Sequence, residues 1–106
     1  MKSYIQITTT TETKEQAEKI AQYLVETKLA ACVQITGPIT SIYRWKGKVE
    51  NTQEWLCLIK TLDYLYNKVE AAIKSQHPYE TPEIIAVPIV KGSKEYLNWL
   101  ENELKN

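Results

Sequence analysis

The chain has 106 residues, and its 13 Lys plus Arg residues balance 13 Asp plus Glu, so that the formal net charge at pH 7 is zero. This length predicts one domain over residues 1–106 with a modest core. The balanced charge argues against nucleic-acid or anionic-membrane binding, which needs a basic face, and no apolar run is long enough to span a bilayer. Two cysteines in apolar patterns and no secretory leader predict a cytoplasmic protein with reduced thiols.

The first elements are a strand and a helix. Apolar and polar residues alternate over residues 4–10, which predicts a half-buried strand. Thr13 and Gln16 have the spacing of a capping box, and an apolar stripe runs from Ala17 to Val25. A helix is therefore expected to follow the strand.

Residues 29–45 and 49–61 are rich in β-branched, apolar and aromatic residues, which predicts two long strands around a turn at Gly47. The Gly37-Pro38 pair indicates a bulge, because strand character resumes at Ile39. A ribbon this long is only marginally stable alone. It must lie on its own sheet or on another subunit.

A second helix is predicted over residues 63–76, a strand over residues 83–90, and a short final helix that Ser93 caps. The order strand, helix, strand, strand, helix, strand predicts an α+β, ferredoxin-like βαββαβ domain with a short C-terminal helix. Right-handed crossovers place both main helices on one face of the sheet. The other face is left bare, which predicts an oligomer.

The connector from His77 to Pro88, which runs from the second helix into the last strand, holds the only histidine and three of the four prolines. Pro78 and Pro82 stiffen it, and it carries four polar groups: His77, Tyr79, Glu80 and Glu83. Two interpretations stay open. The connector holds functional side chains in place, or its prolines only stop a helix and His77 is an ordinary helix-end residue.

The residues that several functions of ferredoxin-like domains require are absent from this sequence. The chain has no basic RNA-binding motif, and the position of a metal-chaperone Cys-x-x-Cys reads Thr8-Thr9-Thr10-Thr11. The sole arginine, Arg44, lies in the ribbon rather than in an anion-binding loop. No nucleophile–base pair or phosphate-binding glycine loop is present in the sequence. An enzyme is therefore not expected.

Four separated motifs resemble the CutA family of divalent-cation tolerance proteins. They are Leu29-Ala30-Ala31-Cys32-Val33, Ser41-Ile42-Tyr43-Arg44-Trp45 with Gly47-Lys48, Ile59-Lys60-Thr61, and His77-Pro78-Tyr79-Glu80-Thr81-Pro82-Glu83. The resemblance extends through Tyr96-Leu97 and Trp99-Leu100 and covers essentially the whole chain. It implies a homotrimer in which ribbons pair across subunit boundaries. It also implies a non-catalytic role in tolerance of copper and other divalent metals, and a trimer similar in shape to the PII signalling proteins.

His77 and Cys32 are the candidate metal ligands, since neutral imidazole and thiolate favour copper over magnesium. The alternative for Cys32 is a small apolar residue in a buried strand. Some family members carry a cysteine near the end of the first strand and a His-His pair before Pro-Tyr, where this chain has Thr8 and Gln76-His77. The resemblance therefore implies weak copper binding.

A second candidate site is a polar pocket in a cleft between subunits. Five residues match family positions that resemble such a pocket: Trp45, Glu54, Lys60, Tyr79 and Glu80. A lysine within an apolar strand needs a carboxylate partner, which Glu54 or Glu80 would supply. Either these charges pair across the trimer and fix its register, or they receive a small anion or metabolite.

Three hypotheses follow. The first is a trimeric, non-catalytic protein of divalent-metal homeostasis that binds metal weakly. The second is a PII-like sensor that binds a small metabolite between subunits and signals to a protein partner. The third and least favoured is an enzyme with His77 as general base and Glu80 as its orienting carboxylate.

Overall fold

The computed structural model describes residues 3–105. Its elements are β1 (Tyr4–Thr11), α1 (Lys14–Glu26), β2 (Cys32–Trp45), β3 (Lys48–Leu62), a short 3-10 turn (Asp63–Leu65), α2 (Tyr66–Gln76), β4 (Ile85–Pro88) and α3 (Lys94–Asn102). Their order is the βαββαβ arrangement with a C-terminal helix that the sequence predicts.

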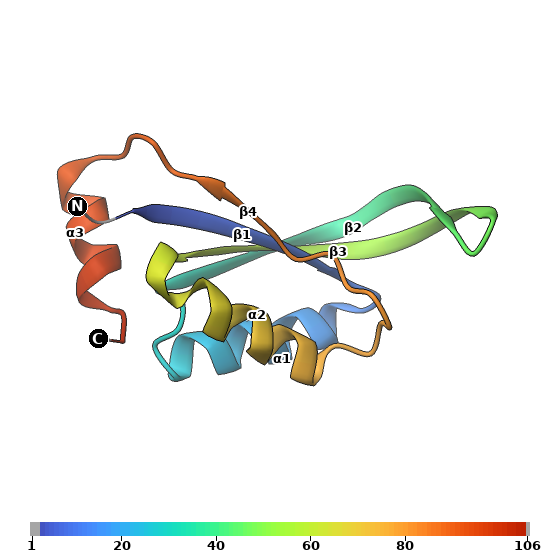
Figure 1. Cartoon of the computed structure of the whole chain (residues 1–106), viewed down its shortest axis with the longest axis horizontal. Helices are drawn as coiled ribbons and strands as arrows, with labels where there is room; N and C mark the ends of the chain where they lie inside the picture. The colour runs from blue at the N-terminus through green and yellow to red at the C-terminus, as the bar shows by residue number, and fades with distance from the viewer. Residues whose placement is uncertain (1–2, 106) are drawn as a thin grey trace.

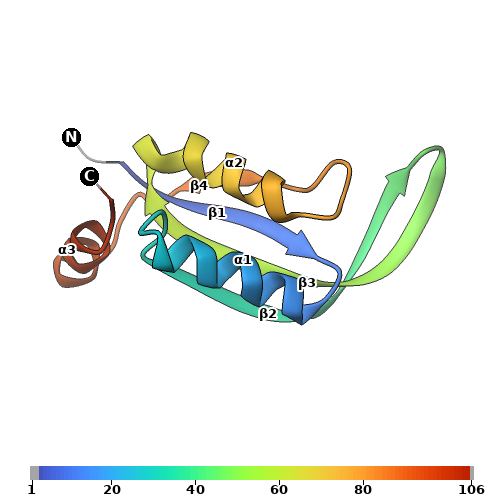
Figure 2. The same cartoon turned by 90° about the horizontal axis from the view of Figure 1, so that it is seen from below.

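The four strands form one antiparallel sheet in the order β2-β3-β1-β4. Both α1 and α2 cover one face of this sheet, whereas α3 lies at the end away from the ribbon (Figure 1). Seen from the helical side, the β2-β3 ribbon projects well beyond α1 and α2 (Figure 2). The domain is consequently elongated, with extents of 44 × 25 × 22 Å.

Two predicted helix starts are confirmed by their side-chain caps. Thr13 Oγ1 accepts the N–H of Gln16 at 3.2 Å, and Gln16 Oε1 accepts the N–H of Glu12 at 3.2 Å. Ser93 Oγ likewise accepts the N–H of Tyr96 at 3.2 Å at the start of α3. Each cap satisfies backbone donors that the first helical turn leaves without partners.

Three element boundaries differ from the sequence prediction. Strand β2 begins at Cys32 rather than Leu29, because the N–H groups of Leu29 and Ala30 both donate to the Leu24 carbonyl and end α1. The predicted helix over residues 63–76 starts with the 3-10 turn, and α2 begins only at Tyr66. Strand β4 spans only Ile85–Pro88, and Pro82 and Pro88 offer no N–H to lengthen its ladder.

The ribbon bends where the sequence predicts a bulge. Its register shifts between Thr36 and Ile39, and a Cβ on Gly37 would lie 2.6 Å from the Trp55 ring, so only glycine fits there. At the tip, Trp45 pairs with Lys48 around a two-residue turn in which Lys46 and Gly47 both have positive φ, 49° and 81°. This is the turn geometry that matches the twist of paired strands.

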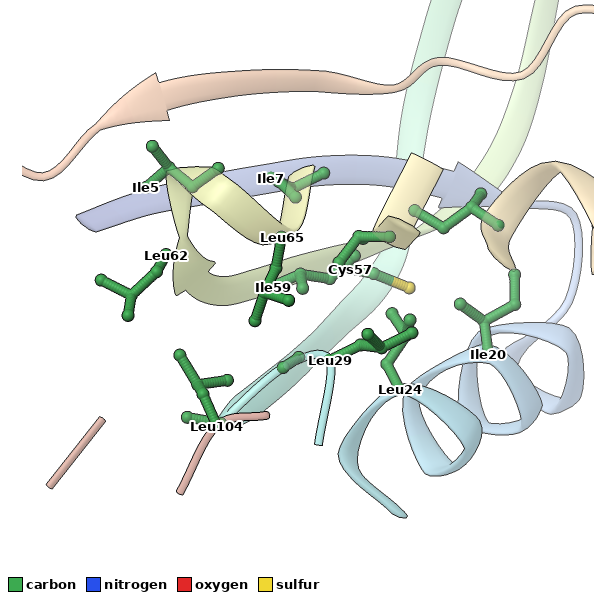
Figure 3. Close-up of a cluster of buried hydrophobic side chains, with 14 of the residues drawn as sticks. Ile5, Ile7, Ile20, Leu24, Leu29, Cys57, Ile59, Leu62, Leu65 and Leu104 are labelled. Carbon is green, nitrogen blue, oxygen red and sulfur yellow. The ribbon is translucent and has the colours of Figure 1, made fainter. Parts of the chain in front are cut away.

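The hydrophobic core lies between the sheet and the two helices that cover it (Figure 3). Its fully buried members come from every layer: Ile7, Ala17, Leu24, Cys57, Ile59, Val69, Ile73 and Leu100. Leu65, Val69 and Ile73 are buried, and Ala72 is half-buried against them, which is the spacing of one helical face. Dense packing of such residues is the main stabilising contribution to the fold.

Cys57 is fully buried, and burial raises the pKa of its thiol from 9.0 to about 11. Because the folded pKa exceeds the unfolded one, this thiol stabilises the fold below pH 9, and the contribution is lost as the pH rises to about 11. We expect a smaller fall in unfolding free energy between pH 9 and 11 in Cys57→Ala than in the natural chain, as measured by urea titration.

In a Cys32→Ser protein at pH 8, Cys57 should react with a disulfide reagent only after urea unfolds it. Rapid labelling of the folded protein would contradict this expectation.

The sheet face opposite α1 and α2 is largely uncovered in the described chain, as predicted, although α3 reaches its end, where the Tyr4 hydroxyl donates to Glu101 Oε2 at 2.7 Å. Tyr4, Gln6 and Thr8 lie on it, and the side chains of Ile85 and Val87 on β4 are 53% and 49% exposed. Among the described residues, no helix is long and apolar enough to cross a membrane.

Candidate functional site

The connector is fastened to β1 by the histidine at its start. His77 is 9% exposed, its Nε2 lies 2.6 Å from the carbonyl oxygen of Thr10, and its Nδ1 accepts the N–H of Tyr79 at 3.2 Å. Since Nδ1 is an acceptor, Nε2 carries the proton and donates to Thr10. Both ring nitrogens of the neutral imidazole are thus engaged by the backbone.

Tyr79 continues this chain of contacts to the ribbon. The centroid of its ring lies 4.6 Å from the centroid of the His77 ring, and its hydroxyl donates to Glu54 Oε2 at 2.9 Å. Burial is the main cause, and the hydrogen bond to Glu54 the second, of a strongly raised pKa for Tyr79. The phenol therefore remains a hydrogen-bond donor at neutral pH. Glu54 on β3 is only 6% exposed.

A cleft of about 770 Å³ lies between the connector and the ribbon. Its lining comes from β1, both ribbon strands and the connector: Thr10, Ser41, Ile42, Tyr43, Trp45, Glu54, Tyr79, Glu80, Thr81, Pro82 and Glu83. Three of these residues are carboxylates and three are aromatic, and none of the described lining residues is Lys, Arg or His. The cleft is therefore acidic with aromatic walls, which suits a cation rather than an anion.

The structure brings four of the five predicted pocket residues together and leaves one outside. Trp45, Glu54, Tyr79 and Glu80 line the cleft, but Lys60 does not. Lys60 Nζ instead donates to Gln34 Oε1 at 2.8 Å on the bare sheet face, and it lies 5.7 Å from the Tyr96 ring centroid. Its partner is a neutral amide, not the Glu54 or Glu80 carboxylate that the sequence suggested.

The two predicted metal ligands lie apart within the chain. Cys32 pairs with Lys60, whereas Thr10, the partner of His77, pairs with Leu56, four residues or about 13 Å further along β3. Within residues 3–105, no group of three or more His, Cys, Asp and Glu side chains gathers to hold a metal ion. A soft metal site built from His77 and Cys32 does not fit this single-chain geometry.

Three contributors to the cleft were not among the predicted pocket residues. Tyr43 shares the strand face of Trp45, so the period of two along β2 could have found it. Glu83 lies in the connector motif itself. Lys46 reaches the rim, where its Nζ lies 3.6 Å from Glu80 Oε2, and no local pattern predicts that contact between ribbon and connector.

Comparison with known protein families places these features in context. Residues 5–103 match the family described as CutA1 divalent ion tolerance protein. The chain belongs to this family.

CutA1 relatives agree with the chain in both sequence and fold. The divalent-cation tolerance protein CutA of Thermus thermophilus is 50% identical over 91 residues, which cover 86% of this chain and 88% of that protein. A solved Thermus thermophilus structure has a TM-score of 0.90 at 45% identity and covers 99% of this chain and 100% of that one. The CutA1 crystal structure from Oryza sativa has a TM-score of 0.95 at 38% identity, with coverages of 98% and 95%.

Other CutA1 relatives are longer and come from several compartments. The chain spans about half of two eukaryotic relatives, 53% of the chloroplastic CutA of Arabidopsis thaliana and 47% of human CutA, at 42% and 46% identity. A solved Archaeoglobus fulgidus CutA is described as periplasmic. Cellular location therefore varies among the relatives, and the fold alone does not assign it.

Proposed function

We propose that this chain acts in divalent-cation tolerance as a non-catalytic cytoplasmic protein that binds cations weakly in the cleft. Glu54 carries the proposal, because it is a nearly buried carboxylate that lines an acidic cavity and has the Tyr79 hydroxyl as its hydrogen-bond partner. Buried carboxylates normally pair with a cation or coordinate a metal. Glu54 and Glu80 would supply oxygen ligands to an entering ion.

Copper is the cation that the family resemblance implies. Among divalent first-row metals, Cu²⁺ binds a given set of oxygen ligands most tightly, so the cleft would favour it without a thiolate or an imidazole. A site with so few ligands would hold copper weakly, which fits a role in buffering rather than in permanent storage.

The first test is a calorimetric titration of the metal-free protein with CuCl₂, ZnCl₂ and MgCl₂. We expect weak saturable binding in which copper is favoured, and about tenfold weaker binding in Glu54→Gln. Glu15→Gln, which removes the same charge from the first turn of α1 and outside the cleft lining, should bind as the natural chain does. Unchanged affinity in Glu54→Gln, or no saturable copper binding at all, would refute the proposed site.

Two contacts argue against catalysis. A general base needs an accessible lone pair, but His77 Nδ1 already accepts the N–H of Tyr79. Glu80, the carboxylate suggested to orient His77, instead forms its ion pair with Lys46. The geometry thus supports a binding protein.

The proposed assembly is a homotrimer with its ribbons paired across subunits and its bare sheet faces turned inward. The exposed apolar side chains on β4 and the projecting ribbon support it, since both leave surface that association would cover. Light scattering should give three times the chain mass of 12.3 kDa. Val87→Asp on the bare face should dissociate the assembly, whereas Val25→Asp, on α1 and 43% exposed, should not. A monomer at micromolar concentration would contradict the trimer.

A second candidate function is small-metabolite sensing, with the signal passed to a protein partner. The size of the cleft and its aromatic walls favour it, because small-molecule sites typically enclose about 300–1,000 Å³ and are lined largely by apolar and aromatic groups. Such a ligand would raise the melting temperature by mass action. Glu54→Gln should abolish that rise, and Lys60→Ala should not.

A further inference from the structure

One ammonium group already lies at the mouth of the cleft. Lys46 Nζ is 3.6 Å from Glu80 Oε2 and 5.6 Å from the centroid of the Trp45 ring, and both partners line the cleft. A carboxylate on one side and an aromatic face on the other are the two partners that an organic ammonium ion uses. Lys46 lies in the tight turn at the ribbon tip, and its contact with Glu80 joins that tip to the connector.

The inner part of the cleft also holds a carboxylate and aromatic rings, but no lysine or arginine side chain lies among its described lining residues. Glu54 is 6% exposed, its Oε2 accepts from Tyr79, and no described lining residue carries a positive charge. Tyr43 and Tyr79 add aromatic surface to that of Trp45. A carboxylate buried to this degree is stabilised when a cation reaches it.

We propose that the cleft binds a small organic ammonium ion, with the charged nitrogen at Glu54 and the aliphatic body against Trp45 and Tyr43. This inference rests on the second candidate function above and names the chemical class of its ligand. An ammonium group needs only one carboxylate and an aromatic face, whereas a bare metal ion needs several close oxygen ligands. An anion would meet three carboxylates and no lining cation.

Lys46 would compete with the proposed ligand, because its ammonium group already contacts Glu80 and the Trp45 ring. Its side chain and Glu80 are each 71% exposed, so their ion pair is weak and exchanges readily with solvent or ligand. An entering ammonium ion would displace Lys46 from Trp45 and Glu80. Removal of the Lys46 charge should therefore strengthen ligand binding.

The test is a calorimetric titration of the full chain with 1,5-diaminopentane at constant ionic strength, beside the uncharged analogue 1,5-pentanediol. We expect saturable binding of the diamine only. Affinity should fall about tenfold or more in Glu54→Gln and about three- to tenfold in Trp45→Leu, and should rise about two- to fivefold in Lys46→Met. Light scattering and circular dichroism of each variant establish that assembly and fold are retained.

The outcomes separate this inference from the metal-binding proposal. Copper binding that depends on Glu54, with no diamine binding or with no effect of Trp45→Leu, would overturn the ammonium site and leave the metal site standing. Equal binding of pentanediol would show that charge recognition is absent and would also overturn it. Diamine binding that weakens in Glu54→Gln and Trp45→Leu and strengthens in Lys46→Met supports it, whatever the copper titration gives.

Discussion

Ile59→Ala is expected to lower the free energy of unfolding by about 2–5 kcal/mol. Ile59 is fully buried and lies in the sheet between Ile7 on β1 and Val33 on β2, facing the helices. Truncation leaves a cavity among strands that pair on both sides, so the surrounding backbone cannot collapse to fill it. Small domains have total stabilities of about 5–15 kcal/mol, and the loss would therefore be a large share of the whole.

Urea titration at one fixed protein concentration measures this loss, because stability depends on concentration if the chain associates. Val25→Ala provides the matched control. Val25 ends the apolar stripe predicted for α1, but the structure leaves it 43% exposed, so its truncation should cost less than about 1 kcal/mol. Similar losses for the two variants would mean that Ile59 does not lie in a tightly packed core.

His77→Ala should destabilise the fold by about 2–4 kcal/mol while it leaves weak copper binding in place. The substitution removes the partners of two backbone groups, the carbonyl of Thr10 and the N–H of Tyr79. Polar groups that are left buried without partners each cost about 1–3 kcal/mol. Copper binding should persist because the proposed ligands, Glu54 and Glu80, are unchanged and neither contacts His77 through a hydrogen bond.

The unfolding curve and the copper titration of one His77→Ala preparation test both parts. Gln76→Ala, at the last residue of α2, is the neighbouring control and should have a small effect on either measurement. If copper binding vanished while stability stayed unchanged, His77 would be a metal ligand and its backbone contacts would be incidental.

The order of elements could be predicted because its signals are local. The alternation in β1 separates Ile5 and Ile7 from the residues of the bare face, and the caps at Thr13 and Ser93 mark helix starts through contacts three residues apart. The bulge near Gly37 follows from the same short-range chemistry. Each of these features depends on neighbours in the chain, which a single sequence displays.

The cleft could be predicted only in part, because its contacts join distant segments. The family resemblance implied Trp45, Glu54, Tyr79 and Glu80, but the sequence could not show that Lys60 forms a hydrogen bond with Gln34, 26 positions away. The expectation of an anion depended on that lysine, and without it the lining is acidic. Likewise, a sequence does not reveal which backbone groups the two nitrogens of a histidine contact.

The two walls of the cleft differ in how firmly they are supported. Pairing between β1 and β3 ends at Thr11 and Trp55, so the outer ribbon, residues 39–54, rests on no third strand within the described chain. The connector wall, by contrast, is clamped to β1 through His77. A two-stranded segment opens at lower free energy than a central sheet does. Within one chain the ribbon wall is therefore the less supported of the two, and the proposed pairing of ribbons across subunits would supply the neighbour that it lacks.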